Sequence, residues 1–173
     1  ILPEQTLMAG FVILTVIALA VSIAVSTLFF IICVQLIALS YFYSAPPLRL
    51  KDWPVAGLVA NAYAIGFLGS LAVFPDMTVD NTGLLGWDNP FYFAMAVGGV
   101  YLLTIIPDRT GDVASGKQTA GALVGRRMTI ALSVCWLSVA VVAGWQSAFW
   151  PLVWIAVLSV AAVAMAWVTS SDR

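Results

Sequence analysis

Long apolar runs separated by short polar segments make up most of the chain. The first run, Leu7 to Ser44, is too long for one membrane crossing, because a spanning helix needs roughly 20 residues. We therefore expect two helices that meet near Ser26 and Thr27. The whole pattern predicts an all-α, polytopic transmembrane helical bundle, a single membrane domain with six spans at about residues 7–25, 28–44, 55–74, 91–106, 128–145 and 148–168.

The composition agrees with a protein that is surrounded by a lipid bilayer. Hydrophobic residues make up 62% of the chain and charged residues 9%, with a mean hydropathy of +1.04. Soluble domains average about 45–50% apolar and about 25% charged residues. Cys33 and Cys135 lie in apolar runs and the chain has no histidine, so we expect neither zinc nor haem. We also expect no nucleic-acid partner.

The basic residues predict the orientation in the cell membrane. If six spans are present, all seven fall on one side of the bilayer: Arg49, Lys51, Arg109, Lys117, Arg126, Arg127 and Arg173. The connections on the other side have no Lys or Arg, and the one from Pro75 to Pro90 carries three aspartates. The positive-inside rule then makes the basic side cytoplasmic.

The segment 107–127 holds the densest group of charges. Asp108 and Asp112 are spaced i, i+4, so on a helix they project about 40° apart. Paired carboxylates suit Mg²⁺, which takes one or two carboxylates and shares its other positions with water and phosphate oxygens. Lys117 and Arg109 could then complement a diphosphate. Alternatively, these charges only mark a solvated helix end and set the topology.

The other basic connection, residues 43–54, contains two consecutive prolines. Pro46 and Pro47 end the second span and hold an extended turn, which restricts where Arg49 and Lys51 point. Such rigidity suits a phosphate site. The segment is also explained as a helix stop with two cations that set the topology.

Together, the two segments resemble a known family. Tyr-Ser-x-Pro-Pro-x-Arg-x-Lys at 43–51 and Pro-Asp-x-x-Gly-Asp-x-x-x-Gly-Lys-x-Thr at 107–119 are similar to motifs of the UbiA superfamily of intramembrane prenyltransferases. The resemblance covers nearly the whole chain. It implies a cavity open to lipid, in which a prenyl diphosphate places its tail among apolar helices and its head under cytoplasmic loops.

The resemblance also implies an activity and a set of site residues. We expect transfer of the prenyl group to an acceptor, with an aromatic quinone precursor as the favoured class. The implied metal-binding and catalytic residues are Asp108 and Asp112, which would hold Mg²⁺. The diphosphate would be bound by Arg49, Lys51, Lys117 and Arg109, and the cavity would be lined by Tyr43 and Asn61. An interhelical hydrogen bond explains Asn61 equally well.

The chain departs from the family pattern in two places. The first family motif, Asn-x-x-x-Asp-x-x-x-Asp, is absent, and Ile105 stands where a number of members place an additional acid. Family members have about nine helices, so we expect an internal fragment that corresponds to the third through eighth. A degenerate relative without catalysis is the alternative. In either case we expect this chain alone to be inactive.

Other classes of membrane protein compete with this interpretation. A CDP-alcohol phosphotransferase would also use a D-x-x-x-D motif and Mg²⁺, but its preceding Asp-Gly-x-x-Ala-Arg is missing here. A transporter or channel usually needs ionisable groups within its spans, and the predicted spans have none. A non-catalytic scaffold or partner-dependent subunit remains as the alternative, and it predicts that the two aspartates are dispensable.

Overall fold

The computed structural model describes residues 3–73, 88–146 and 150–169. In these ranges the chain forms helices joined by short turns, and no strand is present. Most of the acidic connection predicted between Pro75 and Pro90 lies outside the described residues, and so do residues 147–149 and 170–173.

The helices follow the predicted apolar runs. Their bounds are α1 (Glu4–Val25), α2 (Thr27–Ser44), η1 (Leu50–Asp52), α3 (Pro54–Asn61), the π-helix η2 (Ala62–Leu68), α4 (Gly69–Val73), α5 (Asp88–Ala114), α6 (Ala120–Gln146) and α7 (Trp150–Thr169). The elements α3, η2 and α4 are consecutive and together form the third span, Pro54–Val73. Within the described residues, five helices are long and apolar enough to cross a membrane, and α7 contains a shorter apolar stretch, Val153–Met165. A helical membrane bundle is therefore confirmed.

The break in the first apolar run occurs at Ser26, as predicted. Ser26 has an extended backbone, with φ −167° and ψ 159°, and its hydroxyl accepts a hydrogen bond from the Phe29 N–H at 3.0 Å. A serine in this conformation is a favoured N-cap, because its oxygen satisfies a free N–H of the first turn. The cap begins α2 and separates it from α1.

The helix that contains the predicted fourth span extends beyond the predicted end of that span. We expected it to end at Ile106 and residues 107–127 to form a loop, but α5 continues through Pro107 to Ala114 and α6 already begins at Ala120. Proline removes one backbone donor from a helix, yet the helix continues past Pro107. The connection is reduced to residues 115–119, and both motif aspartates lie on α5.

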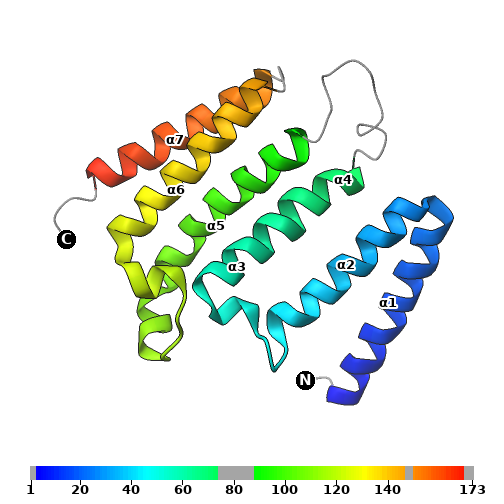
Figure 1. The fold of residues 1–173 in the computed structure, drawn as a ribbon. Helices are drawn as coiled ribbons and strands as arrows, with labels where there is room; N and C mark the ends of the chain where they lie inside the picture. The colour runs from blue at the N-terminus through cyan, green and yellow to red at the C-terminus, as the bar shows by residue number, and fades with distance from the viewer. Residues whose placement is uncertain (1–2, 74–87, 147–149, 170–173) are drawn as a thin grey trace.

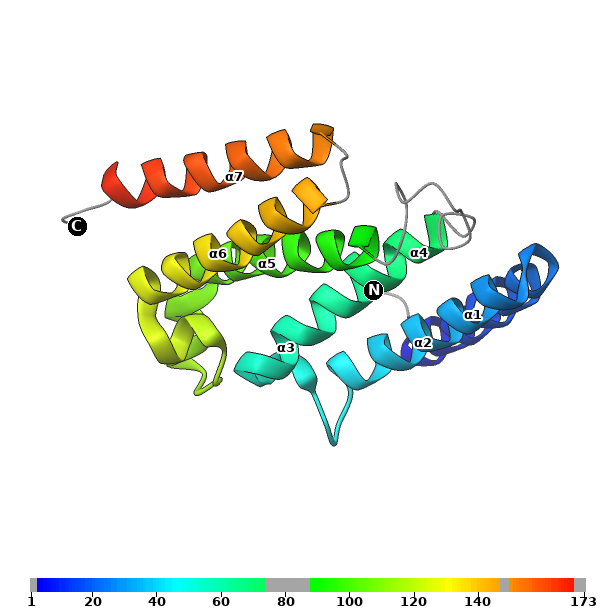
Figure 2. The ribbon, with the colours of Figure 1, turned by 45° about the horizontal axis from the view of Figure 1, so that its top comes forward.

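Successive helices pack against one another in chain order, with α5 between the third span and α6 (Figures 1 and 2). Small residues allow the close approaches, as is common between membrane helices. Gly99 of α5 lies under Leu137 of α6, and its carbonyl accepts a hydrogen bond from Ser133 Oγ at 2.7 Å. Gly66 lies directly against Ala94, because a Cβ there would come 2.5 Å from the Ala94 Cα.

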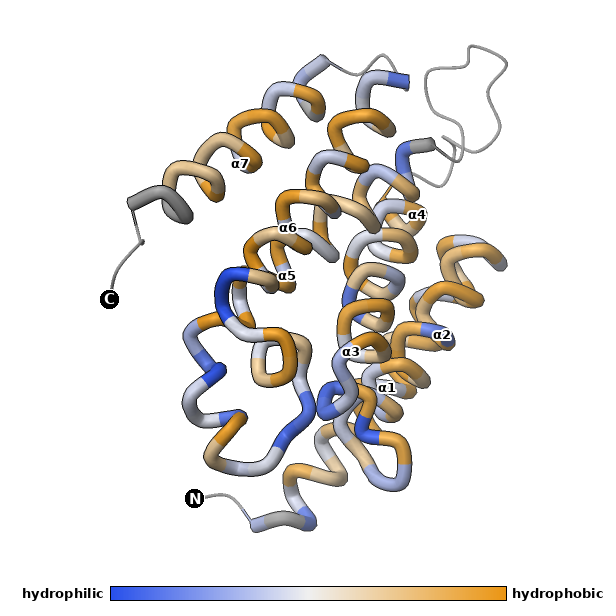
Figure 3. The backbone as a smooth tube through the Cα atoms, turned by 60° about the vertical axis from the view of Figure 1, so that its left-hand side comes forward, coloured by the Kyte–Doolittle hydropathy of each residue, from blue (hydrophilic) through white to orange (hydrophobic). Residues whose placement is uncertain are grey.

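Hydrophilic residues gather at one end of the bundle. Figure 3 shows them in the turn between α5 and α6 and beside it in the connection between α2 and α3. The helix shafts are apolar, and many large side chains on them are exposed, such as Leu14 on α1. In a bilayer those side chains would face lipid, so the polar end is where the charged chemistry can meet water.

Candidate functional site

The polar end of the bundle contains a pocket of about 310 Å³ that joins the two motif segments. We call it the polar pocket. Five of the residues predicted from the sequence line it, namely Tyr43, Lys51, Asp108, Asp112 and Lys117. They are joined there by residues that the sequence analysis did not assign to a site, which are Asp52, Tyr101, Thr104, Ile105 and Thr119.

The end of α5 positions Lys117 beside Asp112. The Lys117 N–H bonds the Asp112 carbonyl at 3.0 Å, and the Gly116 N–H bonds the Val113 carbonyl at 3.2 Å. This pattern is a Schellman motif, which needs a left-handed residue at Gly116, where φ is 70°. The turn also allows Lys117 Nζ to pair with Asp112 Oδ1 at 3.2 Å. The local structure therefore explains the Gly-Lys sequence of the motif: the glycine adopts the left-handed conformation, and the lysine pairs with Asp112.

The two aspartates of the motif have different environments. Asp112 is only 8% exposed, and its other oxygen, Oδ2, accepts a hydrogen bond from Thr119 Oγ1 at 3.0 Å. The Thr119 oxygen also lies 3.4 Å from the Ala122 N–H in the first turn of α6. Asp108, one helical turn earlier, is exposed. One carboxylate is thus held in place by two donors, while the other faces solvent.

Three of the four predicted diphosphate ligands have protein partners: besides Lys117, which pairs with Asp112, these are the two arginines. Arg49 Nε pairs with Asp52 Oδ2 at 3.1 Å, and Arg109 Nε donates to the Gly121 carbonyl at 3.1 Å. Neither arginine is among the residues that line the polar pocket. The binding of a diphosphate by the two arginines stays a prediction. In the structure, their side chains stabilise the turns around them through these contacts.

Asp52 is a site residue that the sequence analysis missed. It lines the polar pocket, and its Oδ1 is buried without a hydrogen-bond partner. A buried carboxylate oxygen without a partner is unfavourable, so it is available to a cation or donor that enters the pocket. The sequence could have identified Asp52 as a candidate, because it directly follows Lys51 in the proline-containing segment.

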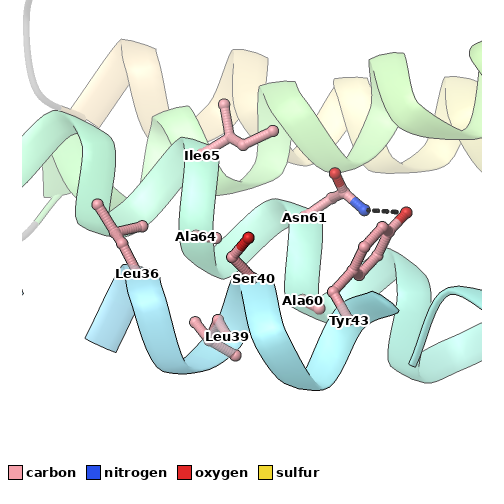
Figure 4. Close-up of a pocket in the computed structure, with 8 residues that line it drawn as sticks. All are labelled: Leu36, Leu39, Ser40, Tyr43, Ala60, Asn61, Ala64 and Ile65. Atoms are coloured by element: carbon pink, nitrogen blue, oxygen red, sulfur yellow. Dashed lines mark hydrogen bonds between the residues drawn. The ribbon is translucent and has the colours of Figure 1, made fainter. Parts of the chain in front are cut away.

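A groove of about 250 Å³ lies between α2 and the third span, and we call it the α2 groove. Figure 4 shows the residues that line it, which are Leu36, Leu39, Ser40, Tyr43, Ala60, Asn61, Ala64 and Ile65. At its polar end Asn61 Nδ2 donates to Tyr43 Oη at 3.1 Å and to the Gly57 carbonyl at 2.9 Å. Asn61 therefore lines a cavity and also makes the interhelical hydrogen bond.

A second groove, of about 370 Å³, lies between the third span and α5, and we call it the α5 groove. It is lined by Asn61, Ile65, Ala96, Val97, Val100, Tyr101 and Thr104. Gly57 makes room for the tyrosine at its polar end, because a Cβ on Gly57 would come 2.9 Å from Tyr101 Oη. Tyr101 and Thr104 precede Asp108 by seven and four residues, and helical periodicity from that aspartate could have identified them.

The donor atoms at the polar pocket can be compared with the needs of a metal ion. Within the part of the chain that the structure describes, no group of three or more His, Cys, Asp or Glu side chains is close enough to hold a metal. Mg²⁺, however, commonly uses one or two carboxylates and completes its shell with water and substrate phosphate. Asp108 and Asp112 line the same pocket, and two carboxylates suit a Mg²⁺ that is shared with a phosphorylated ligand, so their binding of Mg²⁺ stays a prediction.

Comparison with known proteins gives one informative similarity. The chain is 32% identical over 128 residues to the lycopene elongase/hydratase of Haloarcula japonica. The similar region is 72% of this chain and 41% of that protein, so the chain spans less than half of the relative's length. No protein-family model matches, and neither does any solved structure. Over most of its length, this helical membrane protein is thus similar to part of an enzyme named for its action on an isoprenoid.

Proposed function

We propose that this chain is part of a UbiA-type prenyltransferase, which moves a prenyl group from a prenyl diphosphate to an acceptor within the membrane. The observation that carries the proposal is the continuity of the polar pocket with two largely apolar grooves, through Tyr43 on one side and through Tyr101 and Thr104 on the other. A ligand with an anionic head and a hydrocarbon tail matches that arrangement. The similarity to an enzyme named for lycopene supports an isoprenoid substrate.

The residues of the polar pocket suggest how the diphosphate leaves. Lys51 and Lys117 bind the diphosphate oxygens and orient the allylic C1 toward the apolar grooves. Asp108 and Asp112 would hold Mg²⁺, which supplies positive charge to the leaving diphosphate. The C1–O bond breaks with its electron pair going to the diphosphate, the acceptor's π electrons bond to C1, and the acceptor loses a proton. The apolar walls of the grooves keep water from the allylic cation.

For the acceptor we propose an aromatic quinone precursor. The hydroxyl groups of Ser40 and Tyr43 and the amide of Asn61 line the α2 groove, and such groups can bind a substituted ring. A polyene hydrocarbon is the second candidate, because the Haloarcula relative is named for lycopene. By the distribution of the basic residues, we propose that the polar pocket faces the cytoplasm.

The test is diphosphate release by the full-length gene product that contains this chain, measured in lipid nanodiscs with Mg²⁺, a prenyl diphosphate and each class of acceptor. Asp108→Asn and Asp112→Asn should each lower the rate by about 100-fold or more, since the lost metal interaction is worth several kcal/mol. Asp88→Asn makes the same chemical change at the other end of α5 and should leave the rate unchanged.

Three results would contradict the proposal. Full activity of both aspartate variants would show that the carboxylates are dispensable for catalysis. No diphosphate release by the unaltered protein with any donor and acceptor would favour the non-catalytic scaffold instead. Transfer of the phosphoalcohol group from a CDP-linked alcohol to a second alcohol, with release of CMP, would identify the competing phosphotransferase class.

A further inference from the structure

The membrane-crossing part of α6 begins just after a break in the helix. Gly125 has φ 78° and ψ 167°, a conformation that is essentially confined to glycine, and it interrupts α6 shortly after its start. From Met128 to Gln146 the helix has no charged residue, and this stretch rises about 28 Å, close to the thickness of a hydrocarbon core. Arg126 and Arg127 therefore lie at the boundary of the hydrocarbon.

Arg109 of α5 lies at the same boundary. The residues from Asn89 to Pro107 are uncharged, so the apolar part of α5 ends just before Arg109 and its neighbour Asp108. The helices α5 and α6 pack against each other and are joined by a short turn, so they run in opposite directions and their charged ends meet.

The guanidinium of Arg109 reaches the break in α6. Its Nε donates to the Gly121 carbonyl at 3.1 Å, and its Nη2 lies 3.9 Å from the position that a Cβ on Gly125 would occupy. Gly125 directly precedes Arg126. Three arginines from two helices thus gather around the break, and we call Arg109, Arg126 and Arg127 the arginine cluster.

The arginine cluster retains donors for a ligand. Arg126 and Arg127 are exposed, and in residues 3–73, 88–146 and 150–169 neither side chain makes an ion pair or a hydrogen bond. Arg109 uses its Nε for the Gly121 carbonyl, and none of the three arginines lines the polar pocket. A ligand of the cluster is therefore distinct from a diphosphate bound in that pocket.

Exposed apolar side chains flank the arginine cluster. Leu123 and Val124 precede the break and Met128 follows it, and they are 58%, 45% and 54% exposed. Cations beside exposed apolar side chains, at the level of the hydrocarbon boundary, match a molecule that has an anionic head and acyl chains. Basic sites between membrane helices bind anionic lipid headgroups in this way.

We propose that the arginine cluster binds the headgroup of an anionic phospholipid in the leaflet at the polar end of the bundle. The planar guanidinium groups donate to the phosphate oxygens, for which arginine is well suited, and the acyl chains contact the apolar side chains around the break. This lipid site does not require prenyl transfer, so it stands or falls independently of the proposed function.

The experiment measures the dissociation constant of the tightest bound lipid by native mass spectrometry of the full-length gene product in detergent. The probes are phosphatidylglycerol, which is anionic, and phosphatidylcholine, which has a phosphate but no net charge. The double variant Arg126→Gln/Arg127→Gln and the single variant Arg109→Gln remove charges from the cluster. Arg49→Gln is the matched control, because it makes the same change at an arginine that pairs with Asp52 at the same polar end.

At about fivefold for each arginine, the unaltered protein should prefer phosphatidylglycerol by about 25-fold or more. The double variant should lose most of this preference and Arg109→Gln about fivefold of it, while Arg49→Gln keeps it and phosphatidylcholine binding does not change. If Arg109→Gln unfolds because it loses its bond to Gly121, the double variant still decides the test, since the side chains of Arg126 and Arg127 have no such bond in the described parts of the chain.

Three results would overturn the lipid site. The unaltered protein could bind the two lipids equally, which would show that the cluster does not select an anionic headgroup. Equal losses in Arg49→Gln and the double variant would show only a general attraction to the basic end. Displacement of phosphatidylglycerol by millimolar inorganic phosphate would assign the cluster to a soluble phosphate instead of a lipid.

Discussion

Thr119 offers a sharp test of how the polar pocket is held together. Its hydroxyl donates to Asp112 Oδ2 at 3.0 Å and lies 3.4 Å from the Ala122 N–H at the start of α6. Thr119→Val keeps the shape of the side chain and removes both interactions. Asp112 is almost fully buried, so the lost donor leaves a carboxylate oxygen without compensation.

The size of the effect follows from the two interactions. A hydrogen bond to a charged group contributes about 1.5–3 kcal/mol, and a helix cap typically about 1 kcal/mol. The bond to Asp112 is therefore the larger contribution. If about 2 kcal/mol of it is lost in the transition state, kcat/KM for diphosphate release falls about 30-fold, because each 1.36 kcal/mol is a factor of ten.

The assay measures kcat/KM and the melting temperature of the full-length gene product with Thr119→Val and Thr119→Ser. Serine retains the hydroxyl and should restore both the cap and the bond to Asp112. We therefore expect the serine variant to be close to the unaltered protein and the valine variant to lose activity and some stability. Equal activity of all three proteins, or a serine variant as impaired as the valine variant, would refute the role given to this hydroxyl.

Two further predictions each compare two residues of similar chemistry that have different surroundings in the structure. Lys51→Ala should raise the donor KM more than Arg49→Ala, because Lys51 lines the polar pocket and Arg49 does not. Steady-state rates measured at increasing donor concentration give the KM of both variants, and an equal increase in KM would contradict the prediction. Gly66→Ala should destabilise the fold by about 1–3 kcal/mol, because the added Cβ overlaps Ala94, as in other overpacked cores. Gly10→Ala is its control, since a Cβ there meets nothing within 4 Å, and thermal unfolding that is equal for the two variants would show that the helix contact is looser than described.

Hydropathy and motif spacing were sufficient to predict the helical class and the main candidate residues. The break at Ser26 was visible because a span has a limited length and a serine is a good cap. The pairing of Asp108 with Asp112 was visible because a helix repeats every 3.6 residues. Both are local properties, so they depend on residues that are neighbours in the chain. The extension of α5 past Pro107 was missed because proline usually ends a helix.

The tertiary structure alone decided which charges face the polar pocket. Lys51 and Arg49 are two residues apart and both basic, yet of the two only Lys51 lines the pocket, whereas Arg49 pairs with Asp52. The grooves likewise depend on distances between α2, the third span and α5, which are set by close contacts such as Gly66 on Ala94. Sequence spacing specifies positions within one helix, whereas a cavity is formed by side chains of several helices, and its shape follows from how those helices pack.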